Sequence, residues 1–286
     1  MTDTTTKKTA TVGVLALQGA FSEHVQLLRR ASALITSPYS LNFIEVRTTE
    51  QLATCSALII PGGESTTMAI IAERNQLLEP LREFVKVSRR PTWGTCAGMI
   101  LLAESANRTK VGGQELIGGL DVRVNRNHFG RQVESFSEPL KLSFLGEDEK
   151  PFAAVFIRAP VVEALLPATK GNPKAEEVHA PSKKPAGELE AKFMDEGHVE
   201  VLAEIHRRGH SKKGLDKADR PQEEVEDKER ERERKGDARV VAVRQGNVVG
   251  CSFHPELTGD VRMHKWWLEQ VIEDLKRREK LGGEVV

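Results

Sequence analysis

Short apolar runs alternate with amphipathic stretches along the first part of the chain. Residues 11–17 and 57–60 are almost wholly apolar, as expected of strands covered on both faces of a parallel sheet, and residues 41–46 form a similar run. After the first run, Val25, Leu28 and Ala31 recur at helical spacing between arginines. This β-α-β order predicts an α/β fold.

The same pattern returns near the end of the chain. Residues 153–157 are strand-like, and residues 240–244 and 248–253 are two apolar runs joined by a turn that contains Gly246. A final amphipathic helix carries Trp266 and Trp267. We expect these elements to complete the sheet and cover it.

A charged segment interrupts the apolar pattern at about residues 168–237, where Lys, Glu, Arg, Pro and Gly dominate. Such a composition buries too little apolar surface to offset chain entropy. Within it, residues 197–205 are apolar enough for a core strand, and residues 223–235 could form a charged helix. We therefore predict a flexible tail at residues 1–10 and a single domain at residues 11–286, with a largely disordered insertion.

Composition narrows the possible environments and partners. The formal net charge is zero, which gives no electrostatic reason to expect nucleic acid or an anionic membrane as a partner. No apolar run approaches the ~20 residues that span a bilayer. Cys55, Cys96 and Cys251 are too far apart in sequence for a CxxC pair, and the histidines of the insertion lack ligand partners at usable spacing. We expect a soluble, cytoplasmic protein with no metal and no cofactor.

Cys96 lies at the centre of the stretch Gly94-Thr95-Cys96-Ala97-Gly98, between a strand-like run and an apolar helical run. Glycines two residues away on each side suit a sharp strand-to-helix elbow, which exposes the central side chain. Cys96 is therefore a candidate nucleophile. A buried structural cysteine between two glycines is the alternative interpretation.

His254 and Glu256 supply what a nucleophilic thiol needs, namely a base and a group that orients the base. Residues two apart in an extended segment project to the same side. A glycine pair, Gly62-Gly63, lies at the end of another predicted strand, where backbone N–H groups can bind negative charge. Open α/β sheets place their sites at these carboxyl ends.

Several motifs together resemble the class I, or triad, glutamine amidotransferases. They are Pro61-Gly62-Gly63-Glu64-Ser65-Thr66-Thr67, the Cys96 stretch, and His254-Pro255-Glu256-Leu257-Thr258. Further stretches resemble the glutaminase subunit of pyridoxal 5'-phosphate synthase: Leu17-Gln18-Gly19-Ala20 with Glu23-His24, Arg126-Asn127 with Phe129-Gly130-Arg131-Gln132, and Phe156-Ile157-Arg158-Ala159-Pro160. The resemblance implies a flavodoxin-like three-layer sandwich around a mostly parallel sheet.

The resemblance also implies a role for each matching residue. Cys96, His254 and Glu256 would form the catalytic triad, and the N–H groups of Gly63 and Ala97 would form the oxyanion hole. The positions that match glutamine-binding residues are Gly63, Glu64, Ser65, Arg126, Ile157 and Arg158. Gln18 matches a position at the interface with a (β/α)8-barrel synthase subunit, which would receive the ammonia.

Other functions remain open on the sequence alone. A different triad amidotransferase or a γ-glutamyl hydrolase would use the same cysteine chemistry on the same fold. A non-catalytic interaction protein, whose charged insertion binds a regulator, is a third possibility. The intact set of Cys96, His254 and Glu256 favours an enzyme.

Overall fold

The computed structural model describes residues 7–107, 114–126, 135–166, 177–181, 198–206 and 238–282. Its main feature is an 11-stranded sheet in the order β10-β5-β6-β9-β12-β13-β4-β3-β1-β2, with β11 paired to β12. One half of this sheet is parallel. It consists of β2 (Ser40–Val46), β1 (Thr9–Leu15), β3 (Ala57–Ile60), β4 (Thr92–Thr95) and β13 (Val248–Cys251).

The other half of the sheet is mainly antiparallel, apart from the parallel pair β5 and β6. Its strands are β12 (Ala238–Gln245), β9 (Val161–Leu165), β6 (Leu120–Asn125), β5 (Ala103–Asn107), β10 (Glu177–His179) and β11 (Glu200–His206). A separate two-stranded sheet pairs β7 (Ser135–Leu140) with β8 (Phe152–Ile157).

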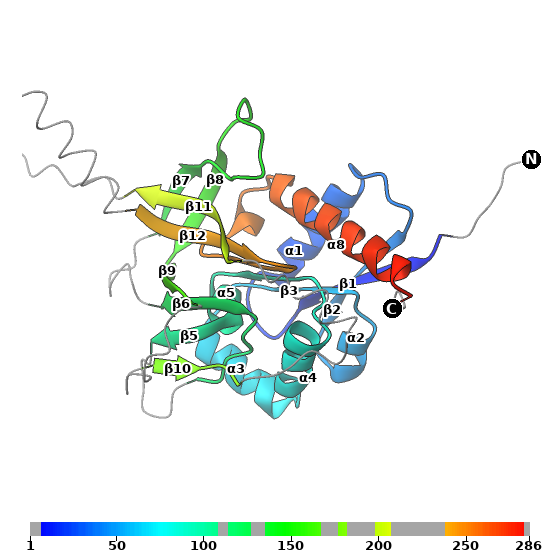
Figure 1. Cartoon of the computed structure of the whole chain (residues 1–286), viewed down its shortest axis with the longest axis horizontal. Helices are drawn as coiled ribbons and strands as arrows, with labels where there is room; N and C mark the ends of the chain where they lie inside the picture. The colour runs from blue at the N-terminus through cyan, green and yellow to red at the C-terminus, as the bar shows by residue number, and fades with distance from the viewer. Residues whose placement is uncertain are drawn as a thin grey trace, which may run out of the picture.

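Helices cover both faces of the parallel half (Figure 1). On one face lie α1 (Phe21–Ser32) and α8 (Arg262–Lys280). The other face carries α2 (Thr49–Ala53), α3 (Ser65–Arg74), α4 (Leu78–Arg82), the π-helical turn η1 (Glu83–Val87) and α5 (Ala97–Leu102). A short 3-10 helix, η2 (Pro255–Leu257), follows β13.

Side-chain alternation along β3 explains why its sequence is apolar throughout. Ala57 and Ile59 belong to the core beneath α1 and α8, whereas Leu58 and Ile60 belong to the core on the opposite face. A strand with helices on both sides therefore has no polar face. The predicted three-layer α/β fold is confirmed.

Two details differ from the sequence-based expectation. β1 begins at Thr9, within the predicted tail, and the helix after Cys96 ends at Leu102 and passes directly into β5. Of the predicted insertion, the structure describes β10 and β11, and β11 matches the core strand expected there. The charged stretch 223–235 lies outside the described residues.

Candidate active site

Cys96 occupies the sharp turn that joins β4 to α5. Its backbone has φ +48° and ψ −105°, which is an unusual conformation for a residue other than glycine. A Cβ on Gly98 would lie 1.9 Å from the carbonyl oxygen of Ile60, and a Cβ on Gly94 would lie 2.5 Å from the Gly98 carbonyl. Both flanking glycines are therefore required by close backbone approach, as the elbow predicts.

His254 and Glu256 meet beside this turn, in the segment that leaves β13. The Nδ1 atom of His254 lies 2.8 Å from Oε1 of Glu256, whose side chain is fully buried. The backbone N–H of His254 donates to the carbonyl of Val155 on β8 at 2.8 Å, so β8 holds the segment in place. Because Nδ1 of His254 contacts Glu256, Nε2 is the ring nitrogen that can exchange a proton with the Cys96 thiol.

The electrostatics favour a charged imidazole. Burial lowers the pKa of His254, but hydrogen bonds with Cys96 and Glu256 outweigh this effect and raise the pKa to about 10. Burial likewise raises the pKa of Glu256, and interactions with His24 and His254 more than compensate, so this pKa lies well below its usual range. At neutral pH the pair is an imidazolium and a carboxylate.

The glycine pair after β3 runs against this cluster. A Cβ on Gly62 would lie 2.4 Å from the Cε1 atom of His254 and 3.4 Å from the Cβ of Cys96. The side chain of Gln18, from the β1–α1 loop, reaches the same strand end, where its Oε1 accepts from the backbone N–H of Glu64 at 2.9 Å. The structure therefore places Gly63, between these contacts, next to the elbow.

Glu64, Ser65 and Arg126 form a polar group at the start of α3. The carboxylate of Glu64 caps α3 by accepting from the N–H groups of Thr66 and Thr67, at 3.1 and 2.7 Å. Nη2 of Arg126 donates to Oγ of Ser65 at 2.9 Å, and it lies 4.0 Å from Oε1 of Glu64. Burial lowers the pKa of Arg126, although Glu64 opposes the shift.

Ile157 and Arg158 approach the thiol from the end of β8. The carbonyl oxygen of Ile157 lies 4.0 Å from Sγ of Cys96. Arg158 is exposed and has φ +44°, so the chain turns sharply directly after this contact. Asn127 and residues 129–132, which also carried the resemblance, lie outside the described residues.

The other two cysteines have no such surroundings. Cys55 and Cys251 are fully buried free thiols, and burial raises the pKa of Cys55 to about 11 and that of Cys251 well above its usual value. A thiol that stays protonated is a poor nucleophile. Of the three cysteines, Cys96 alone lies beside an imidazolium.

Two residues to which the sequence analysis gave no role also belong to this region: Gln114, and His24 from one of the stretches that carried the resemblance. Oε1 of Gln114 accepts from Oγ of Ser65 at 2.9 Å and from Oγ1 of Thr66 at 3.2 Å. His24 lies 3.3 Å from Oε2 of Glu256. A polar residue on the apolar side of α1 was the available signal for His24; for Gln114 the sequence held none.

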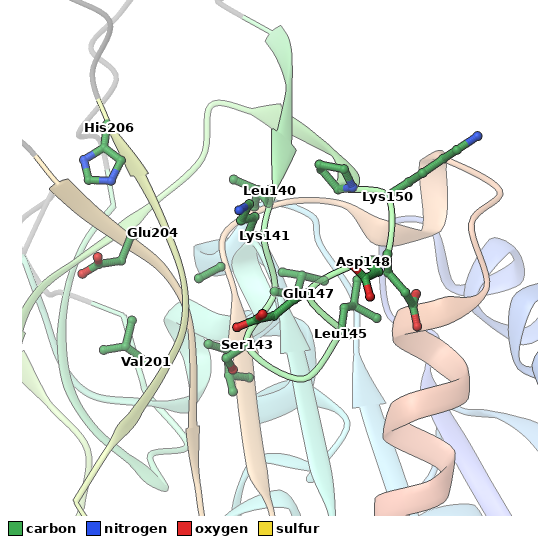
Figure 2. Close-up of a pocket in the computed structure, with 16 residues that line it drawn as sticks. Leu140, Lys141, Ser143, Leu145, Glu147, Asp148, Lys150, Val201, Glu204 and His206 are labelled. Atoms are coloured by element: carbon green, nitrogen blue, oxygen red, sulfur yellow. The ribbon is translucent and has the colours of Figure 1, made fainter.

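Neither metal binding nor a rival site is indicated in the described part of the chain. No group of three or more His, Cys, Asp or Glu side chains there is arranged to hold a metal ion. A separate hollow lies between the segment 140–151 and β11 (Figure 2), and none of the predicted site residues lines it. Within the same described ranges, no helix has the length and apolar character needed to cross a bilayer.

Comparison with known proteins finds relatives over most of the chain. The profile of the SNO glutamine amidotransferase family matches residues 14–182 and 217–273. A probable pyridoxal 5'-phosphate synthase subunit PDX2 of Arabidopsis thaliana is 41% identical, over 92% of this chain and 86% of the relative. The pyridoxal 5'-phosphate synthase subunit PdxT of Herpetosiphon aurantiacus is 38% identical, over 90% and 98%.

A crystal structure of a glutamine amidotransferase is similar in fold and sequence. It superposes with a TM-score of 0.58 at 36% identity, and the match covers 91% of this chain and 98% of the other. The chain therefore belongs to the SNO glutamine amidotransferase family.

Proposed function

We propose that this protein is the glutaminase subunit of a pyridoxal 5'-phosphate synthase. It hydrolyses L-glutamine to L-glutamate and ammonia in the cytoplasm and passes the ammonia to a (β/α)8-barrel partner subunit. The observation that carries the proposal is the Cys96 elbow beside the His254–Glu256 pair, since this arrangement suits nucleophilic attack on an amide. Three free cysteines are in keeping with a reducing compartment.

Substrate recognition is assigned to the polar group at the start of α3. Arg126 would bind the α-carboxylate of glutamine, because a guanidinium forms strong charge-assisted hydrogen bonds with a carboxylate. Its buried position beside Ser65 supports this role. Gly63, Glu64, Ile157 and Arg158 would complete the pocket, in which the carbonyl oxygen of Ile157 lies 4.0 Å from the Cys96 thiol.

The reaction would proceed through a thioester. The Cys96 thiolate attacks the side-chain amide carbon of glutamine, and a C–S bond forms as the carbonyl becomes an oxyanion. His254, as an imidazolium, donates its proton to the nitrogen, the C–N bond breaks, and ammonia leaves. His254 then accepts a proton from water, which attacks the thioester and releases glutamate. Glu256 keeps the imidazole oriented throughout.

The N–H groups of Gly63 and Ala97 are the proposed oxyanion donors. Ala97 is the first residue of α5, where a backbone N–H has no partner within the helix. Each such donor is typically worth about 3 to 4 kcal/mol of transition-state stabilisation in acyl-transfer enzymes. Gln18 touches the Gly63–Glu64 link, so a partner that docks on the β1–α1 loop would act directly on this strand end.

The test combines the protein with a barrel synthase subunit, glutamine, and a pentose and a triose phosphate. We expect glutamate and pyridoxal 5'-phosphate to form together. Cys96→Ala should abolish both products, whereas added ammonium should restore pyridoxal 5'-phosphate without glutamate. Failure of the unmodified chain with glutamine, combined with success with ammonium, would show that this chain is not the donor.

A γ-glutamyl hydrolase is separated from this proposal by its substrate. Such an enzyme would cleave γ-glutamyl peptides without a barrel subunit and would release no ammonia. A purely scaffolding protein would release no glutamate with or without the barrel subunit.

A further inference from the structure

Two buried histidines form a pair directly behind the catalytic carboxylate. His24 on α1 and His264 on α8 are both fully buried, and Nδ1 of His24 lies 2.9 Å from Nε2 of His264. Trp93 on β4 packs against both rings, with centroid separations of 5.7 and 4.9 Å. The pair therefore lies in the core between the sheet and the two helices, with no access to solvent.

His24 also touches the carboxylate of Glu256. Its Nε2 lies 3.3 Å from Oε2 of Glu256 and 3.4 Å from Oγ1 of Thr95, the residue before Cys96. The other carboxylate oxygen, Oε1, is engaged by His254. At 3.3 Å the His24 contact is longer than an ideal hydrogen bond, and among the described residues Oε2 has no hydrogen-bond partner of good geometry, so His24 is the group placed to satisfy it.

Protonation states in this cluster follow from its contacts. Since Glu256 is a carboxylate, Nε2 of His24 must carry a proton, because an imidazole lone pair would repel the anion. Burial is the main reason that the pKa of His264 lies well below its usual value, so this ring has one proton. Placing that proton on Nε2 satisfies the contact with Nδ1 of His24.

These contacts give His264 as donor to His24, His24 as donor to Glu256, and His254 as donor to the same carboxylate. The rings of His24 and His254 each contact one oxygen of the Glu256 carboxylate. We propose that His24 is a positioning residue of the active site, which fixes the Glu256 carboxylate in the orientation that receives His254. His24 makes no contact with the thiol or the substrate in this account, so it acts only through Glu256.

His24 also influences the charge of Glu256. Burial raises the pKa of this carboxyl group, and His24 is the foremost of the groups that lower it, ahead of His254. The other titratable groups that interact with Glu256 are His264 on α8 and Cys251 on β13. Without the Nε2–H donor of His24, we expect Glu256 to take up a proton at higher pH, which would leave the His254 imidazolium without its partner.

Two variants separate positioning from packing. In His24→Asn the side-chain amide ends near the place of Nδ1, so it can still meet His264 but cannot reach Glu256. In His24→Gln the amide nitrogen falls near the place of Nε2 and can donate to Oε2. We expect His24→Asn to lower kcat by about 10- to 100-fold with little change in KM, since a hydrogen bond to a charged group typically carries that much free energy.

Two readouts follow the variants across pH. The first is glutamate release in the complex with the barrel subunit, which rests on the proposed function. The second is the rate of alkylation of Cys96 by iodoacetamide in the chain alone, followed by mass spectrometry, with the buried Cys55 and Cys251 as internal references. We expect the acid limb of both profiles to move to higher pH in His24→Asn and to stay near its original position in His24→Gln.

Unshifted acid limbs in His24→Asn, or equal shifts in both variants, would overturn the positioning role. If His24→Asn does not fold, His264→Leu can be compared with His264→Gln to test the same positioning role. Glutamine keeps a donor near the place of Nε2 of His264, and leucine does not. Absence of glutamate release by the unmodified complex would refute the proposed function, while the alkylation profiles would still decide the role of His24.

Discussion

Gly98 provides a quantitative test of the elbow that presents Cys96. An alanine Cβ at this position would lie 1.9 Å from the carbonyl oxygen of Ile60, against an ordinary contact of at least 3.4 Å. About 1.5 Å of movement between α5 and β3 is therefore needed, and both partners are backbone. Overpacking a core costs about 1 to 3 kcal/mol and occasionally more. The clashing atoms belong to the backbone and cannot rotate away as a side chain could. The cost of Gly98→Ala should therefore lie at the upper end of this range.

The higher helix propensity of alanine opposes this loss of stability, but its effect is smaller. Gly98 lies inside α5, where alanine is favoured over glycine by roughly 0.5 to 1 kcal/mol. The net loss should therefore be about 2 kcal/mol or more. For a chain of this size, 1 kcal/mol corresponds to roughly 2 to 4 °C in the melting temperature, so we expect a decrease of at least about 4 °C.

Differential scanning fluorimetry of Gly98→Ala and Gly146→Ala measures this effect. Gly146 is the matched control, because the nearest atom to a Cβ there is Cγ of Glu149 at 3.8 Å. Glutamine hydrolysis should also fall in Gly98→Ala, since the shift of α5 moves Cys96 and the N–H of Ala97. Melting temperatures within about 1 °C for the two variants would refute the close-approach argument.

Further predictions concern the substrate pocket and the triad histidine. Arg126→Ala should raise KM for glutamine by about tenfold or more with a smaller effect on kcat, and Arg126→Lys should recover part of the loss. Steady-state kinetics measure both values. An unchanged KM in Arg126→Ala would contradict the carboxylate-binding role. The folded-state pKa of His254, about 10, lies above the ordinary value of 6.5, so its contribution to stability is complete below about pH 6.5 and is lost as pH rises toward 10. The stability advantage of the unmodified protein over His254→Gln in urea denaturation should therefore shrink between about pH 7 and pH 10, and a constant difference would contradict the raised pKa.

The sequence predicted the parallel half of the fold because its inner strands, β1, β3, β4 and β13, are buried on both faces. β2 and β3 lie almost where their apolar runs indicated. β5 could not be recognised, since its only apolar residues are alanines and it follows α5 without a turn. β7 alternates exposed and half-buried positions and contains Pro139, which disfavours a strand assignment. Such strands owe their pairing to the neighbours that the fold supplies.

The candidate site was predictable where its chemistry is local. Cys96 lies between Gly94 and Gly98, whose spacing indicates a close turn. His254 and Glu256 are two residues apart in sequence. His24 could not be assigned a role in the same way, because its contact with Glu256 joins α1 to a segment more than 200 residues later. No local sequence pattern indicates that His24 and Glu256 lie close together. The packing of α1 and α8 against β4 brings them together.

The most direct test of the central claim is glutamate release by cysteine variants in the complex with the barrel subunit. Cys96→Ala should show no release above background, whereas Cys55→Ala and Cys251→Ala should keep most of the rate, because burial raises the pKa of both thiols and keeps them protonated. Mass spectrometry of the unmodified chain, quenched during turnover with glutamine, should show a γ-glutamyl group on Cys96. Continued glutamate release by Cys96→Ala would contradict the account.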